Sequence, residues 1–205
     1  RECVFYRKSS RGGCFDENLT YNNTGETMNI WQVSAGDNKR DFSDIFLKHD
    51  IMLAGPGRFG PYTEDSYNRI IKQGLYTTTK IGYIRSFVEK AKAGDIVLLR
   101  ERNEFKSIGI IADETYFHSE IFDDIYGWDL QHARRVIWQE HLKEDLKNLN
   151  LTWGSGKQTS MFSGVNKTYI KKAIDPLTNK FKNRKLKPLP PEYPSLSLEE
   201  FGEEL

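Results

Sequence analysis

Apolar residues in the first part of the central region alternate, then recur at helical spacing, and then form a continuous run. The sequence MNIWQVSAG (28–36) predicts a strand that ends at Gly36, and DIMLAGPG (50–57) predicts a second extended segment broken by its Gly-Pro-Gly. Asp41 is the expected N-cap of a short amphipathic helix between them. The apolar face of this helix consists of Phe42, Ile45, Phe46 and His49. The pattern therefore predicts a strand, a helix and a further strand.

Two further segments extend this pattern. Residues 58–62, RFGPY, combine glycine, proline and aromatic residues, which favours a loop over a helix. Residues 80–95, KIGYIRSFVEKAKAGD, predict a helix that ends at Gly94. The core-facing side of that helix is expected to contain Ile84, Phe87, Val88 and Ala91.

Three β-rich runs follow. DIVLLRER (95–102) and SIGIIADE (107–114) predict a hairpin joined by the polar NEFK (103–106), and ARRVIWQE (133–140) predicts another strand. Strands dominate this order, and two or three helices lie outside them. The expected fold class is α+β.

Composition and charge suggest where the folded domain begins and ends. A chain of 205 residues with 38% hydrophobic and 13% aromatic content fits a single core. The first 27 residues are polar and turn-rich, which predicts a flexible arm or leader. Residues 166–205 are basic, then acidic and proline-rich, which predicts a tail or a linker to an effector domain. The predicted domain therefore spans residues 28–165.

Some function classes are disfavoured. No apolar run approaches the roughly 20 residues of a membrane span, and RECVFYRKSS lacks the apolar stretch of a signal peptide. We therefore expect a cytoplasmic protein, or a nuclear one in a eukaryote. Cys3 and Cys14 are predicted to be reduced thiols, and His118 and His132 to be ordinary barrel-edge residues rather than ligands. No metal or cofactor is predicted.

Several of these segments together resemble one known family. WQVSAG, AGDIVLLR with SIGIIAD after a short turn, and GWDLQHARRVIW resemble the EVE domain of the PUA-like superfamily, which is related to the YTH domain. The resemblance covers residues 28–139 and implies a curved β-barrel with flanking helices. It also implies a reader that holds a methylated base in an aromatic-lined pocket. EVE-like domains are often fused to restriction nucleases or to McrB-type NTPase motor subunits.

The resemblance also implies positions for the pocket. Trp128, just before the last barrel strand, matches a cage wall, and Ser34 and Ala35 match the pocket floor. A second cage aromatic usually follows the first helix, but this chain has no tryptophan there. Candidates for the missing wall are Met52, Phe59 and Tyr62. Trp31 is a further candidate, although its place inside a strand pattern favours the core.

The chemistry of a flipped base explains the polar candidates. A flipped base loses stacking and pairing, so a pocket must supply an apolar sandwich for its faces and fixed polar groups for its edge. Trp128 offers the face, and Asp129 or Asp124 could accept from the exocyclic amine of cytosine or adenine. Ser34 or backbone amides could donate. The expected phosphate contacts are Arg58, Arg100, Arg102, Lys106, Arg134 and Arg135.

The hypothesis is therefore a binding module, not an enzyme, that reads methylated or hydroxymethylated cytosine in DNA as the sensor of a restriction or defence system. One alternative is a YTH-like reader of 6-methyladenine or modified RNA. Another is a metal-dependent nuclease, since Asp95 and Glu104-Phe105-Lys106 imitate a nuclease triad, although the hairpin is expected to keep them apart. A third is a protein-interaction module.

Overall fold

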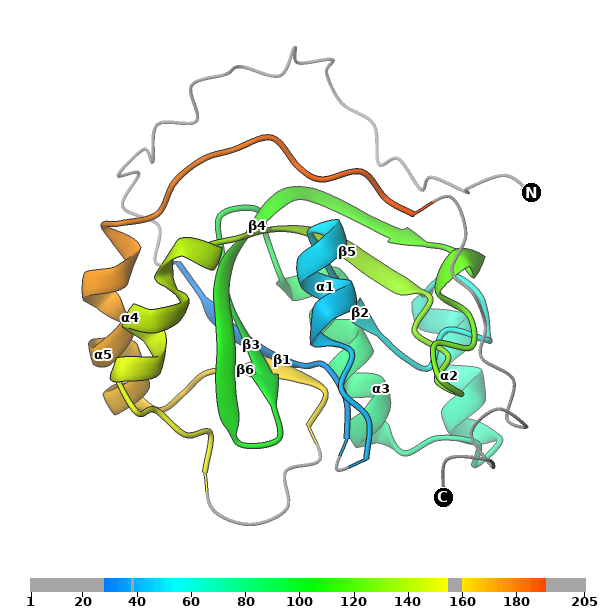
Figure 1. The fold of residues 1–205 in the computed structure, drawn as a ribbon. Helices are drawn as coiled ribbons and strands as arrows, with labels where there is room; N and C mark the ends of the chain where they lie inside the picture. The colour runs from blue at the N-terminus through cyan, green and yellow to red at the C-terminus, as the bar shows by residue number, and fades with distance from the viewer. Residues whose placement is uncertain (1–27, 38, 155–159, 191–205) are drawn as a thin grey trace.

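The computed structural model describes residues 28–37, 39–154 and 160–190 and contains a six-stranded mixed sheet of order β2-β5-β4-β3-β1-β6 (Figure 1). Strands β1 and β3 are parallel, and the other neighbouring pairs are antiparallel. The strands are β1 (Ile30–Ser34), β2 (Ile51–Ala54), β3 (Ile96–Glu101), β4 (Glu104–His118), β5 (His132–Trp138) and β6 (Phe162–Gly164).

Helices cover both faces of this sheet (Figure 1). They are α1 (Ser43–His49), α2 (Glu64–Lys72), α3 (Thr78–Arg85) with the π-helical turn η1 (Ser86–Lys90), η2 (Glu120–Phe122), η3 (Glu140–Leu142), α4 (Lys143–Asn148) and α5 (Thr168–Thr178). Among the residues described, no helix has the length and apolar character needed to cross a bilayer.

The α+β class and the predicted strands are confirmed, with differences at the boundaries. The hairpin turn is only Arg102 and Asn103, so the predicted connection from Glu104 onward belongs to β4. The helix expected to end at Gly94 ends with the π-helical turn at Lys90. Asp41 accepts a hydrogen bond from the Ser43 amide at the start of α1, although Phe42 holds the cap position. Helix α2 was not predicted.

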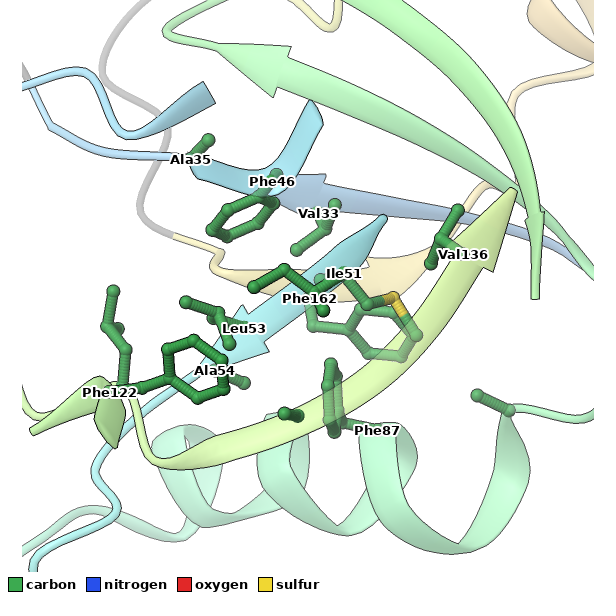
Figure 2. Packing of buried hydrophobic residues seen from close by; sticks show 14 of the residues in the cluster. Val33, Ala35, Phe46, Ile51, Leu53, Ala54, Phe87, Phe122, Val136 and Phe162 are labelled. Carbon is green, nitrogen blue, oxygen red and sulfur yellow. The ribbon is translucent and has the colours of Figure 1, made fainter. Parts of the chain in front are cut away.

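Alternation along the strands divides the core into two clusters on opposite faces of the sheet. Val97 and Leu99 of β3 belong to the larger cluster, with Phe46 and Phe87 from α1 and η1 (Figure 2). The intervening Leu98 belongs to the second cluster, which α4 and α5 cover. Because both faces are buried, β3 is a continuous apolar run from Ile96 to Leu99.

The sheet is not closed into a barrel. Strands β2 and β6 stand at the two ends of the order, and no pairing joins them within the described ranges. The barrel that the resemblance implied is therefore not confirmed.

The predicted domain end at residue 165 does not coincide with the end of the packed structure. Ile170, Ile174 and Leu177 of α5 are buried against Leu146 of α4 and Trp153. These positions recur at helical spacing, so the segment that was predicted to be a basic tail buries an apolar face while its lysines stay outside. The predicted arm at residues 1–27 and the acidic segment at 191–205 lie outside the described residues.

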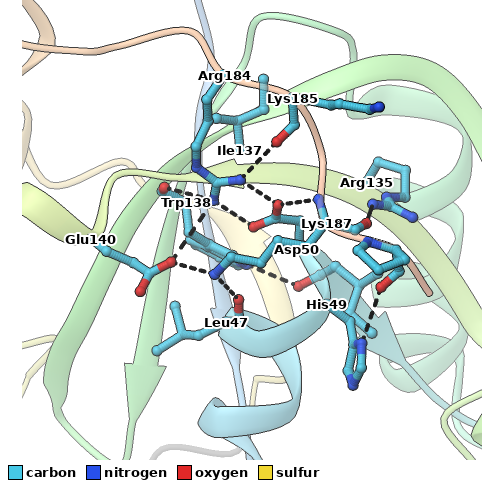
Figure 3. Close-up of polar contacts among 12 residues, drawn as sticks. Leu47, His49, Asp50, Arg135, Ile137, Trp138, Glu140, Arg184, Lys185 and Lys187 are labelled. Carbon is cyan, nitrogen blue, oxygen red and sulfur yellow. Dashed lines mark hydrogen bonds and ion pairs between the residues drawn. The ribbon is translucent and has the colours of Figure 1, made fainter. Parts of the chain in front are cut away.

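Residues 179–190, the C-terminal strap, run from α5 across the molecule to the β5 side (Figure 1). The strap is fixed by Asp50, a fully buried residue in left-handed conformation between α1 and β2. Both carboxylate oxygens of Asp50 accept from Arg184, one of them at 2.6 Å, and the Lys187 amide donates to the same group at 2.8 Å (Figure 3). The Lys187 ammonium donates to Leu47 O at 2.8 Å and pairs with Glu140.

Replacing Arg184 by methionine should lower the free energy of unfolding by about 2 kcal/mol, because a buried carboxylate loses its bidentate partner. The expected loss is below the full cost of breaking a buried pair because the Arg184 side chain is 32% exposed. Urea denaturation measures the change. Lys180→Met removes an exposed pair with Asp145 and should cost less than about 1 kcal/mol. Equal losses in the two variants would contradict the special role of Asp50.

Candidate functional site

An open pocket of about 880 Å³ lies where the loops that flank β1, β2, β5 and β6 meet. Its volume falls in the range typical of small-molecule sites. The lining residues come from five segments, within residues 34–42, 55–58, 76–83, 123–130 and 160–161. Four aromatic side chains contribute, namely Phe42, Tyr76, Tyr83 and Trp128.

Trp128 is presented by a tight turn. The backbones of Ile125 and Trp128 exchange hydrogen bonds of 2.9 and 3.0 Å, and the two central residues, Tyr126 and Gly127, have φ values of 50° and 79°. Turns with two positive φ angles favour glycine, which accounts for Gly127 in this loop. The loop thus holds Trp128 half-buried at the pocket wall.

The loop between β1 and α1 also contacts the Trp128 ring. The Arg40 guanidinium lies 5.3 Å from the Trp128 ring centroid and donates to Tyr126 O at 2.6 Å and to the Asp37 carboxylate at 3.0 Å. The Phe42 and Trp128 rings make a T-shaped contact, with 6.2 Å between ring centroids. Cation–π and aromatic contacts therefore join the β1–α1 loop to the Trp128 loop.

Asp129 follows Trp128 and carries the most unusual polar environment of the pocket. Its Oδ1 is enclosed without a hydrogen-bond partner in the described ranges, and so is Trp128 Nε1. Its Oδ2 lies 3.6 Å from Arg58 Nε. Burial raises the pKa of Asp129, and the nearby Arg58 opposes this shift. Unsatisfied enclosed polar atoms cost about 1–3 kcal/mol each.

The pocket floor, residues 55–57, approaches the Trp128 loop closely. Gly57 N donates to Asp129 O at 3.0 Å, and a Cβ added to Gly55 would lie 2.3 Å from the same oxygen. Only glycine permits this approach at position 55.

The buried His132 ring, at the start of β5, anchors the floor from below. Tyr116 Oη accepts from the Tyr62 amide at 3.0 Å and lies 2.8 Å from His132 Nδ1, to which we assign its hydrogen. The neutral imidazole then carries its own hydrogen on Nε2, which lies 2.9 Å from Pro56 O and 2.6 Å from Tyr67 Oη. Burial lowers the pKa of His132 to about 3, which keeps the ring neutral.

A family model described as "Domain of unknown function (DUF8426)" matches residues 31–163, well over half of the chain. The chain belongs to the DUF8426 family. No curated protein and no solved structure matches it. The matched segment contains all five pocket segments, whereas α5 and the C-terminal strap follow it.

The structure of this DUF8426 domain brings some of the predicted pocket residues together. The pocket is lined by Ser34, Asp124, Trp128 and Asp129, and by Arg58 from the cation set. Ser34 Oγ donates to Gly36 O at 3.1 Å, so its hydrogen is already engaged.

The other pocket candidates lie elsewhere. Ala35 and Met52 are fully buried core residues, and Trp31 donates from Nε1 to the Asp95 carboxylate at 2.7 Å. These three positions face the core because they lie in or beside strands that pack under helices. Phe59 contacts the lining residue Tyr76 from outside the lining, with ring centroids 5.7 Å apart. Tyr62 Oη accepts from Arg85 Nε at 3.0 Å, also outside it.

Two of the six predicted phosphate contacts, Arg100 and Arg134, are buried inside the fold and cannot reach a phosphate. Arg100 is 1% exposed and donates to Gln32 Oε1 at 2.8 Å and to Ser160 O at 2.7 Å. Arg134 is 2% exposed and donates to Phe87 O and Val88 O of η1, both at 2.7 Å. These guanidiniums satisfy carbonyl groups inside the fold, and burial lowers the pKa of both.

The remaining predicted cations lie outside the pocket lining. Arg135 donates to Lys187 O in the strap, and Lys106 pairs with Glu101 at 2.6 Å. Arg102 lies exposed in the hairpin turn. The basic residues that do line the pocket are Lys39, Arg58 and Lys80.

Sequence reasoning missed the part of the lining that comes from residues 76–83. Tyr76, Lys80 and Tyr83 occur in LYTTTKIGY, where aromatic and basic residues interleave, and this was the available signal. Phe42 was expected only as a core residue.

The nuclease triad does not converge. Asp95 precedes β3 and accepts hydrogen bonds from Trp31 Nε1 and from the amides of Asn29 and Lys92. Glu104 lies opposite Glu101 in the register of β3 and β4, at the other end of β3. In the described part of the chain, no group of three or more His, Cys, Asp or Glu side chains is arranged to hold a metal ion.

Stability should depend on pH through His132. Between pH 6.5 and about 3 the unfolded state binds a proton that the folded ring does not, so this contribution is complete above pH 6.5 and is lost as the pH falls towards 3. The slope from this group is at most about 1.4 kcal/mol per pH unit. Urea denaturation at pH 7.5, 6 and 5 measures it.

His132→Gln can keep hydrogen bonds to both sides but cannot titrate, so its stability should vary less with pH than that of the wild type. His141→Gln, at an exposed histidine, should keep the wild-type slope. An NMR titration that placed the His132 pKa near 6.5 would refute the assignment.

Proposed function

We propose that this DUF8426 domain is a reader that holds a flipped, modified nucleobase, with methylated or hydroxymethylated cytosine in DNA as the target. The observation that carries the proposal is that two consecutive residues, Trp128 and Asp129, line the wall of a pocket of about 880 Å³. A base that leaves a helix loses its stacking neighbours and its hydrogen-bonding partner. An aromatic face and a fixed acceptor can replace these two interactions.

The carboxylate suits a base that carries an exocyclic amine. Cytosine and adenine present an amino hydrogen at their pairing edge, whereas thymine and uracil present a carbonyl oxygen. The half-buried Asp129 carboxylate accepts hydrogen bonds when ionised, so it favours cytosine and adenine over thymine and uracil. A 5-methyl group would add apolar contact with the aromatic lining, of about 0.8 kcal/mol.

The rest of the hypothesis rests on the resemblance to EVE and YTH domains. The PUA-like assignment, the role as a sensor in a restriction or defence system and the partnership with a nuclease or NTPase stay predictions, and so does the cytoplasmic location. A reader of 6-methyladenine or modified RNA would use the same two groups. A panel of matched DNA and RNA oligonucleotides with modified and plain bases separates these targets.

Trp128→Ala should fold with little loss of stability and lose about 1–3 kcal/mol of binding to the preferred modified oligonucleotide, because the base loses its stacking partner. Fluorescence anisotropy with the panel measures the affinity, and thermal denaturation checks the fold. Trp128→Phe should recover most of the binding. Tyr169→Ala removes a 52% exposed aromatic from α5 and should leave binding unchanged. A Trp128→Ala protein that is folded and binds as tightly as the wild type contradicts the proposal.

Asp129→Asn should reduce the preference for 5-methylcytosine over thymine at the same position of an oligonucleotide. The two bases share the methyl group and differ at the pairing edge, and an amide can donate to the thymine oxygen whereas a carboxylate cannot. We expect the wild type to prefer 5-methylcytosine by about tenfold or more, in line with a charge-assisted hydrogen bond. Equal preference in the wild type and in Asp129→Asn would show that Asp129 does not read the base edge.

A further inference from the structure

Four residues beside the pocket form a surface of alternating positive and aromatic groups, here called the α3 rim: Arg58, Phe59, Tyr76 and Lys80. The Arg58 guanidinium carbon lies 5.0 Å from the Phe59 ring centroid and 5.9 Å from that of Tyr76. The Lys80 ammonium lies 5.5 Å from the Tyr76 centroid. The loop after β2 and the start of α3 therefore place two cations around one aromatic ring.

These cations remain accessible to solvent. The Arg58 side chain is 60% exposed, and its nearest carboxylate, Asp129, lies at 3.6 Å, a loose ion pair. Lys80 is exposed and forms no ion pair within the described ranges. Exposed cations of this kind can neutralise phosphates and so release the cations that are condensed on a nucleic acid.

Charge is distributed unevenly around the pocket. The Trp128 loop contributes Asp123, Asp124 and Asp129 to the lining, whereas the lining residues from 76–83 include Lys80 and no acid. Phosphates are repelled by the first side and attracted by the second. A strand that inserts a base into the pocket would therefore lay its backbone along the α3 rim.

We propose that the α3 rim binds the phosphodiester backbone that flanks the inserted base. The inference rests on the proposed function, because the pocket defines where the backbone must pass. Among the expected phosphate contacts it keeps Arg58, drops the buried Arg100 and Arg134, and adds Lys80. The aromatic rings keep the two cations spread over the rim, an arrangement that suits a single strand at its exit from the pocket.

The test compares three ligands at several salt concentrations: the modified nucleoside, its 5′-monophosphate, and a short single-stranded oligonucleotide that carries it, as DNA and as RNA. The principal variant is Lys80→Gln, because Arg58 also contacts Asp129. Lys172→Gln, on the exposed face of α5, is the charge-matched control. Isothermal titration calorimetry measures nucleoside binding, and fluorescence anisotropy measures oligonucleotide binding.

Lys80→Gln should weaken binding of the oligonucleotide and reduce the slope of log K against log salt by about 0.7, the value for one single-strand phosphate contact. Arg58→Gln should reduce the slope by a similar amount, and Lys172→Gln should not change it. If the DNA and RNA slopes fall equally, the rim recognises the shared phosphodiester.

The outcomes separate the two proposals. A nucleoside that binds, together with an oligonucleotide whose salt slope is the same in Lys80→Gln and the wild type, overturns the rim and leaves the base pocket standing. A Lys80-dependent salt slope without any nucleoside binding keeps Lys80 as a phosphate contact but overturns the base pocket, and with it the claim that the bound backbone flanks an inserted base. No binding of any ligand at low salt overturns both.

Discussion

The hydrogen bonds of the buried His132 ring join β5 to the loop after β2, and the pocket depends on this attachment. Pro56 O is held from below by His132 Nε2, while Gly57 N reaches over to Asp129 O. The floor and the Trp128 loop are therefore fixed to each other through a strand end and a backbone hydrogen bond. A neutral imidazole with two distinct nitrogens suits this role, because one nitrogen accepts from Tyr116 while the other donates towards the floor.

The sequence predicted the strands well because their apolar content is high and local. It predicted poorly the elements whose signal depends on partners. Helix α2 is a different case, missed although its signals are local: Thr63 caps it, and Tyr67 and Ile70 lie one turn apart on its buried face. Helix α5 has the spacing of Ile170, Ile174 and Leu177, but its lysines suggested a tail. The cluster that buries α5 is assembled from distant segments, which local patterns do not reveal.

Part of the candidate site, Trp128 and Asp129, could also be predicted from the local sequence pattern. Trp128 and Asp129 lie in a loop without any apolar period, and the absence of a packing role pointed to a surface role. Sequence reasoning fails for the buried arginines. A positive charge suggests an exposed side chain, but backbone carbonyl groups inside the fold can accept hydrogen bonds from a buried guanidinium. Arg134 ends inside the fold because the π-helical turn leaves Phe87 O and Val88 O facing it. The position of such carbonyls follows from tertiary structure alone.

The half-buried position of Trp128 has an optical consequence. The chain contains four tryptophans, and the other three, Trp31, Trp138 and Trp153, are at most 8% exposed. A water-soluble quencher such as acrylamide would therefore reach the Trp128 indole in preference to the others. The guanidinium of Arg40 beside that ring makes its emission sensitive to movement of either loop. The domain thus carries its own fluorophore at the pocket wall, and ligand entry can be followed by emission without attaching a dye.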